Sequence, residues 1–227
     1  MAAVYRERAS PVPGVVTWTA PGAAADSLVL PDGCMDLMWQ GDALLVAGPD
    51  TRAQRHPGGG PDHTGLRFPP AMLPPLLGVP AADLRDRQVR LDEVLPAAQV
   101  RRWEERVGTG RPGGVLDAVG LSLTDGRDPR DPAIREVVRA LDTGTWVSDV
   151  AARLGLSPRQ LHRRCLAAFG YGPKVLARIL RLQSALARVR AGDPYATVAI
   201  ERGYSDQAHL ARDVRALTGT TLTALAA

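Results

Sequence analysis

One pattern occurs twice between Val147 and Gly219, and it constrains the fold more than any other feature of the chain. Each copy has a short amphipathic segment, a glycine, and a second amphipathic segment (VSDVAARLGLSPRQLHRRCLAAFG and TVAIERGYSDQAHLARDVRALTG). A shift of 49 residues places Leu161 on Leu210 and the closing Gly170 on Gly219. The apolar positions recur at helical spacing in both copies. The chain is therefore predicted to contain one helix-turn-helix unit twice.

Sequence signals also mark where these helices begin. Ser157 to Gln160 (SPRQ) has the composition of a capping box, with a proline at the first helical position. Asp131 followed by Pro132 predicts a second helix start. Between the copies, apolar residues spaced by 3 and 4 predict a helix of about five turns that ends near Gly192. This helix would set the separation of the two units.

The second segment of each copy turns basic side chains away from its apolar stripe. At about 100° per residue the outward positions are Arg159, His162 and Arg163 in the first copy, and Ala208, Ala211, Arg212 and Arg215 in the second. Arg163 and Arg212 are equivalent. An arginine there is able to donate two hydrogen bonds to a guanine in the major groove, worth about 1–3 kcal/mol of discrimination. The alternative is an ordinary solvated surface arginine.

The second copy, AIERGYSDQAHLARDVRALTG, resembles the signature of the AraC/XylS family of bacterial transcription regulators, and residues 130–222 resemble its DNA-binding domain. The resemblance implies seven helices, with two helix-turn-helix units that enter successive major grooves about 34 Å apart. It places the base-facing residues at Arg159, His162, Arg163, Gln207, His209 and Arg212. We assign Arg164, Arg215 and Lys174 to phosphate contacts or to no DNA contact at all. The chain departs from the family pattern at Cys165, Leu210, Val214 and Leu222, where we expect weaker core packing and a weaker last helix.

Charge divides the chain into two parts. Residues 128–227 hold 15 basic and 9 acidic side chains, whereas residues 1–127 hold 13 and 15. We therefore expect an α+β protein with a β-rich sensor or regulatory domain (1–107), a linker (108–130) and an all-α DNA-binding domain (131–227). The sequence has no run of about 18 uncharged apolar residues and no signal peptide, which predicts a cytoplasmic, nucleoid-associated protein without membrane contact.

The N-terminal part consists of short apolar runs separated by turn-forming residues. Strands are predicted at Val15–Thr19, Ser27–Leu30, Met35–Trp39, Ala43–Ala47 and Gly65–Phe68, and helices near Ala71–Leu77, Ala81–Arg85 and Ala97–Val107. Residues 51–63 are predicted to form a mobile loop. This part resembles the small sensor-like domain that precedes some AraC-family DNA-binding domains.

Several N-terminal side chains are candidates for an effector pocket. Trp18, Cys34, Met38, Trp39 and Phe68 would line a site for a small apolar or aromatic molecule, and the alternative is that they form core. Negative charge from the neighbouring Asp32 and Asp36 is expected to raise the pKa of the Cys34 thiol. His56 and His63 lack metal-ligand spacing with Cys34, and no catalytic motif is present, so neither a metal, a cofactor nor an enzymatic activity is expected.

The sequence thus predicts a regulator of transcription, activator or repressor, that binds double-stranded DNA and is modulated by an effector. Two alternatives stay open. In the first, the N-terminal domain senses nothing and serves homodimerisation or contact with RNA polymerase. In the second, the chain has lost DNA binding and acts only through protein contacts.

Overall fold

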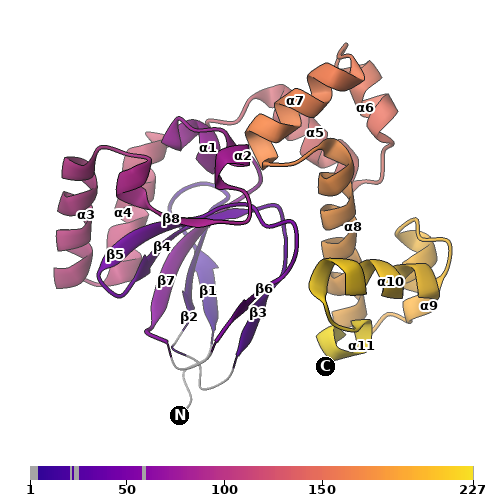
Figure 1. Cartoon of the computed structure of the whole chain (residues 1–227), viewed down its shortest axis with the longest axis horizontal. Helices are drawn as coiled ribbons and strands as arrows, with labels where there is room; N and C mark the ends of the chain where they lie inside the picture. The colour runs from indigo at the N-terminus through magenta and orange to yellow at the C-terminus, as the bar shows by residue number, and fades with distance from the viewer. Residues whose placement is uncertain (1–4, 21, 23–25, 58–59, 227) are drawn as a thin grey trace.

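The computed structural model describes the chain except residues 1–4, 21, 23–25, 58–59 and 227. Within the described residues, strands and four helices are followed by seven further helices, which confirms the predicted α+β class. Figure 1 shows the β-rich part beside an arm of helices arranged around one long helix. No helix among the described residues is long and apolar enough to cross a bilayer.

The N-terminal part contains two antiparallel sheets. The larger sheet has the strand order β1-β2-β7-β4-β5-β8, and β3 pairs with β6 in a separate two-stranded arm. The strands are β1 (Arg6–Ala9), β2 (Val16–Ala20), β3 (Ser27–Val29), β4 (Met35–Gln40), β5 (Ala43–Ala47), β6 (Gln54–His56), β7 (His63–Phe68) and β8 (Gln88–Arg90). The predicted strands are all present, whereas β1, β6 and β8 were missed.

Side chains alternate between the two faces of the large sheet, as β geometry requires. Met35 and Leu37 on β4 enter the hydrophobic core, whereas Asp36 and Met38, which alternate with them, point to the other face. Helices α3 (Ala97–Thr109) and α4 (Pro112–Thr124) cover the core face, on the left in Figure 1. The short helices α1 (Leu73–Leu77) and α2 (Ala81–Leu84) lie at the edge nearest the helical arm.

Helix α4 corrects the predicted linker over residues 108–130. Leu116 and Val119 are fully buried in the N-terminal core, so this segment is part of the β-rich domain. Gly120 permits the close approach, because a Cβ there would lie 2.8 Å from Leu66 Cδ1. Only the residues from Asp125 to Asp131 connect α4 to the next helix.

The predicted mobile loop at residues 51–63 is also wrong in part. Gln54–His56 form strand β6, which pairs with β3 from Val29 to Ser27. His63 begins β7. Residues 58 and 59 of the predicted loop lie outside the described residues.

The C-terminal part consists of seven helices, as the resemblance implies. They are α5 (Pro132–Asp142), α6 (Val147–Arg153), α7 (Pro158–Phe169), α8 (Pro173–Arg190), α9 (Tyr195–Glu201), α10 (Gln207–Thr218) and α11 (Leu222–Ala226). Both predicted helix starts are confirmed: the Ser157 hydroxyl accepts from the backbone N–H of Gln160 in a capping box, and the Asp131 carboxylate accepts from Ala133 N–H. The 18-residue helix α8 carries one helix-turn-helix unit at each end (Figure 1).

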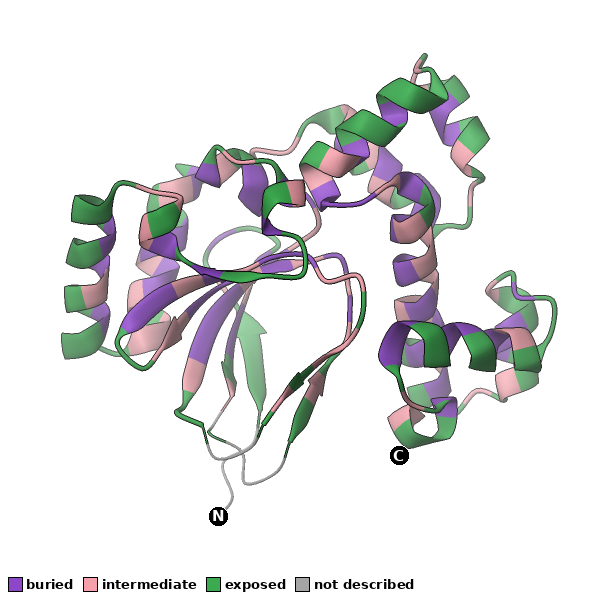
Figure 2. Cartoon of the chain, in the orientation of Figure 1, coloured by how far each residue is buried: buried purple, intermediate pink, exposed green. Residues whose placement is uncertain are grey.

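Each end of α8 has its own core. Its N-terminal half packs with α5, α6 and α7, and its C-terminal half packs with α9, α10 and α11, as the buried bands in Figure 2 show. The four positions that depart from the family pattern all lie within these cores, with exposures of 0% for Cys165, Leu210 and Val214 and 4% for Leu222. All four positions therefore contribute to a core and α11 is formed, while weaker packing at these positions stays a prediction.

Contacts join the β-rich part to both helix-turn-helix units. Arg85 Nη1 donates to Gly170 O at the end of α7 (3.1 Å), and Ala53 N donates to Leu217 O in the last turn of α10 (2.8 Å). Gln183 Nε2 on α8 donates to Pro31 O (2.7 Å). The N-terminal domain therefore touches the long helix and the ends of both second helices.

Candidate functional site

The outward faces of α7 and α10 carry exposed arginines. Arg159 and Arg163 are exposed on α7, and Arg212 and Arg215 are exposed on α10. Among the described residues none of these four forms an ion pair, whereas Arg188 on α8 pairs with both Asp193 (2.5 Å) and Glu201. Guanidinium groups that form no ion pair are available to bind phosphate or a base edge.

The two remaining family positions on α10 differ from each other. Gln207 is exposed in the first turn. The His209 ring is half-buried, packs edge-on against Tyr204 with ring centroids 5.2 Å apart, and its Nδ1 accepts from Ser205 N (3.3 Å). His209 therefore stabilises the turn between α9 and α10.

Three other predicted DNA contacts lie near domain or helix junctions. His162 is exposed, and its ring lies against the turn before α8, since a Cβ on Gly172 would come within 2.6 Å of it. Arg164 Nη1 lies 3.9 Å from Asp131 Oδ2 and lines a groove of about 610 Å³ between the domains. Lys174 is exposed in the first turn of α8. Arg164 thus faces the β-rich domain, away from the outward arginines.

A buried carboxylate that the sequence reading missed anchors α10. Asp213 is 8% exposed, pairs with Arg178 and lies 3.7 Å from Arg181 Nη2, both on α8. Tyr204 OH donates to its Oδ2 (3.2 Å), and Arg181 stacks over the Tyr204 ring at 4.3 Å. This cluster holds α10 against the long helix α8.

The open face of the large sheet forms a cavity of about 830 Å³, which we call the N-terminal cavity. Side chains of β1, β2, β4 and β7 form its floor, the β3–β6 arm forms one wall, and Gln183 and Arg190 of α8 close it. Cavities of about 300–1,000 Å³ are typical of small-molecule sites.

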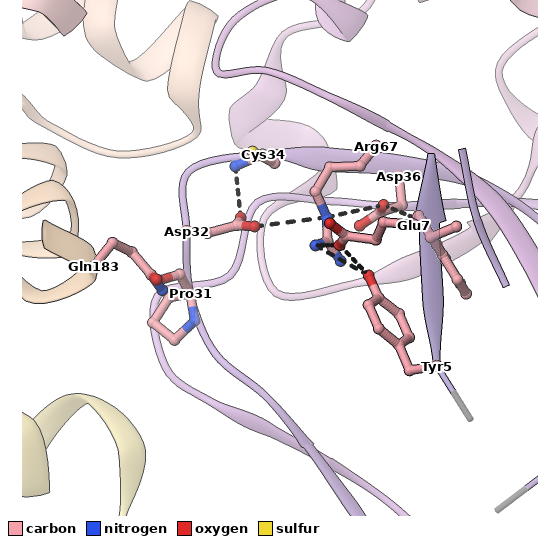
Figure 3. A network of polar contacts seen from close by, with 9 residues as sticks. Tyr5, Glu7, Pro31, Asp32, Cys34, Asp36, Arg67 and Gln183 are labelled. Carbon is pink, nitrogen blue, oxygen red and sulfur yellow. Dashed lines mark hydrogen bonds and ion pairs between the residues drawn. The ribbon is translucent and has the colours of Figure 1, made fainter. Parts of the chain in front are cut away.

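Arg67 lies at the centre of the cavity floor and faces three carboxylates (Figure 3). Its side-chain nitrogens lie 3.4 Å from Asp36 Oδ1, 3.6 Å from Asp32 Oδ2 and 3.4 Å from Glu7 Oε1. Tyr5 OH donates to Glu7 Oε1 (2.5 Å). One guanidinium therefore balances three acidic groups.

Burial shifts the acidic groups of this cavity. Desolvation raises the pKa of Asp36 to about 6 against the opposing effect of Arg67, and desolvation also raises the pKa of Asp50 to about 6. Burial, and then the charges of Asp32 and Asp36, raise the pKa of the Cys34 thiol, as the sequence predicted. The raised pKa values of these carboxyl groups indicate a partly dehydrated site.

Three of the five predicted pocket residues line the cavity, and two do not. Trp18, Cys34 and Met38 are lining residues, and the Trp18 indole donates to Asp36 Oδ1 (2.7 Å). Phe68 is fully buried on the opposite face of the sheet, and Trp39 packs against the same core. Both are wrong as pocket residues because each follows a cavity-facing neighbour by one position, which turns it to the other face.

The charged members of the cavity were missed because they come from separated strands. Asp36 and Arg67 are paired in register between β4 and β7, a neighbourhood that only the sheet reveals. Glu7 lies on the unpredicted strand β1. Among the described residues no group of three His, Cys, Asp or Glu side chains is placed to hold a metal ion.

Two parts of the chain match known domain families. Residues 150–227 match a family described as a helix-turn-helix domain, and residues 15–90 match a family described as a domain of unknown function (DUF6597). Proteins from two strains of Mycobacterium tuberculosis, each named "Probable bifunctional transcriptional activator/DNA repair enzyme AlkA", are 35% identical over 103 residues, or 43% of this chain. The chain spans about a fifth of the length of these curated relatives, since the match covers 21% of each.

Solved structures with a similar arrangement are more distant. A probable AraC family transcriptional regulator from Rhodopseudomonas palustris is 24% identical, covers 42% of this chain and 95% of its own, and has a TM-score of 0.37. Unsaturated fatty acid bound wild-type ToxT from Vibrio cholerae is 10% identical, covers 92% of this chain and 90% of its own, and has a TM-score of 0.46. Because these overlaps are low, the classification of the chain rests on the helix-turn-helix match.

Proposed function

We propose that the chain is an AraC-type transcription regulator that reads double-stranded DNA through α7 and α10, from the premise that residues 150–227 match a helix-turn-helix domain family. The observation that carries the proposal is the pair of exposed, unpaired arginines at equivalent positions, Arg163 and Arg212. Each is offered by the second helix of its own unit.

The length of α8 supports simultaneous reading by both units. An 18-residue helix is about 27 Å long, and the two units lie at its two ends. This length is comparable to the separation of about 34 Å between successive major grooves on one side of DNA. We assign Arg159 to base contact beside Arg163, and Arg215 and Lys174 to phosphate. His209 is left as a bracing residue, so the first unit supplies more of the base discrimination.

The test begins with selection of binding sites from random DNA, followed by mobility shifts with the full chain. Arg163→Ala and Arg212→Ala should each weaken binding to the selected site by roughly 5- to 150-fold and relax the preference at one base position. Arg139→Ala on α5 is the matched control, since Arg139 is 66% exposed but paired with Glu136. Unchanged affinity and preference in both α7 and α10 variants would sink the assignment of these helices to DNA.

We further propose that a small molecule bound in the N-terminal cavity modulates DNA binding. The cavity volume and the contact between Gln183 and Pro31 support this role, because both residues line the cavity and join it to α8. The rival hypothesis gives the domain a purely structural role in dimerisation or RNA polymerase contact. A ligand that binds the folded state raises the melting temperature by mass action, whereas the rival predicts no stabilising compound.

A further inference from the structure

The charged groups that line the N-terminal cavity differ in exposure: most of the recessed ones are acidic, and most of the basic ones are exposed. The acidic lining residues Asp32, Asp36 and Asp50 are only partly exposed, and Arg67 is the recessed arginine that faces them. The other lining arginines, Arg55, Arg87 and Arg190, are exposed, as are the acids Glu7 and Asp86. Exposed charges are screened by water and salt, so the recessed groups dominate inside the cavity.

The recessed groups leave negative charge without a partner. Asp36 and Asp32 share Arg67 with Glu7, and Asp50 accepts from the neutral amide of Gln54 (3.2 Å). His63, which lines the cavity, does not offset this charge, because desolvation and then the neighbouring His56 lower its pKa. A bound cation would therefore gain attraction that no side chain of the described floor supplies.

An aromatic wall stands beside these acids. Trp18 and Tyr5 stack with ring centroids 6.3 Å apart, and the buried side chain of Met38 continues the apolar surface. Gly65 makes room for the indole, since a Cβ there would come within 2.5 Å of the Trp18 ring. Aromatic faces next to carboxylates favour a cation with an organic body.

We propose that the N-terminal cavity binds a small organic cation, an ammonium or guanidinium group on an aromatic or apolar body, with its charged group held by Asp36 and Asp32. This assignment deepens the proposed effector role and rests on it. It adds a positive charge to the small apolar or aromatic effector expected from the sequence, because the cavity floor that the strands form is acidic.

The test measures binding to the full chain by calorimetry and thermal shift. The cationic probes are phenethylamine, phenylguanidine and agmatine, and the matched probes are 2-phenylethanol, which is neutral, and hydrocinnamate, which is anionic. At least one cation should bind more tightly than both matched probes. Binding of hydrocinnamate or 2-phenylethanol in preference to every cation, or no binding by any cation, overturns the proposal.

Variants locate the site. Asp36→Asn should weaken cation binding about tenfold, the loss expected for one charge-assisted contact, while its amide oxygen still accepts from Trp18. Asp32→Asn tests the second carboxylate, and Asp42→Asn, an exposed acid in the turn after β4 that does not line the cavity, is the control. Unchanged cation affinity in both cavity variants, with folding intact by circular dichroism, overturns the assigned site. Mobility shifts on the same preparations report DNA binding separately, so this inference and the DNA-reading proposal fail independently.

Discussion

Replacement of Asp213 by asparagine should loosen the second recognition helix. The side chain is 8% exposed and accepts from Tyr204, while Arg178 and Arg181 of α8 neutralise its charge. Asparagine keeps the shape and one acceptor oxygen but removes the charge, which leaves two guanidinium groups with no acid between them.

The size of the effect follows from burial. Breaking a fully buried ion pair costs about 3–5 kcal/mol. Here the arginine partners are 39% and 33% exposed and recover part of their hydration, so we expect Asp213→Asn to lower the free energy of unfolding by about 2–3 kcal/mol. For a chain of 227 residues this corresponds to a melting temperature lower by roughly 4–12 °C.

The assay is thermal and urea unfolding of the full chain, monitored by circular dichroism. Glu136→Gln is the control, because its ion pair with Arg139 on α5 is exposed to solvent and should contribute little to the free energy of unfolding. The double variant of Asp213→Asn with Arg178→Gln should lose less free energy of unfolding than the two single variants lose together, because the two positions share one interaction. A variant Asp213→Asn that unfolds within about 0.5 kcal/mol of the parent refutes the anchoring role.

Two further predictions concern the cavity floor. Because burial raises the folded pKa of Asp36 to about 6, above the usual value of 3.8, the folded state holds this proton more tightly and stability is lost as pH rises from about 4 through 6. In urea unfolding, the free energy of unfolding of Asp36→Asn should therefore rise by about 2–3 kcal/mol relative to that of the parent between pH 4 and pH 7.5. A difference between the two proteins that stays constant across that range would contradict the shifted pKa. Gly65→Ala should lower the free energy of unfolding by about 1–3 kcal/mol, because its Cβ would displace the Trp18 ring. Gly114→Ala in α4 is the control, since its Cβ meets no atom within 4 Å and the change should be neutral or slightly stabilising in the same assay. Equal stabilities of the two variants would show that the indole does not need the space at Gly65.

The helical half was predictable because its determinants are local. The Ser157 cap, the Asp131 start and the stop at Gly170 each act within one helical turn, so the sequence displays them directly. The turns of the two units differ in length, which the 49-residue shift of their second helices does not reveal. One residue separates Gly155 from the N-cap Ser157, whereas two separate Gly203 from the N-cap Asp206, and the backbone N–H of the extra residue, Ser205, donates to the His209 ring.

The β-rich half was predictable only strand by strand. Helix α4 was missed because its sequence contains three glycines, which disfavour a helix in isolation, and tertiary packing of Gly120 against Leu66 overrides that preference. Strand β6 (QRH) has no apolar residue and exists because β3 pairs with it. One error was avoidable: the alternation of a strand forbids Met38 and Trp39 from facing the same cavity.

The position of the cavity explains how occupancy would reach the DNA-binding helices. Pro31 lies in the segment that lines the cavity and accepts from Gln183 on α8, and Ala53, which is adjacent to the lining residue Gln54, donates to Leu217 at the end of α10. A ligand that shifts either segment changes the contacts that hold the second unit against the N-terminal domain. Both recognition helices are attached to α8, which sets the distance between them. Simultaneous binding in two major grooves depends on this distance. Linkage is reciprocal, so a ligand that changes DNA affinity by a given factor through these contacts must have its own affinity changed by DNA by the same factor.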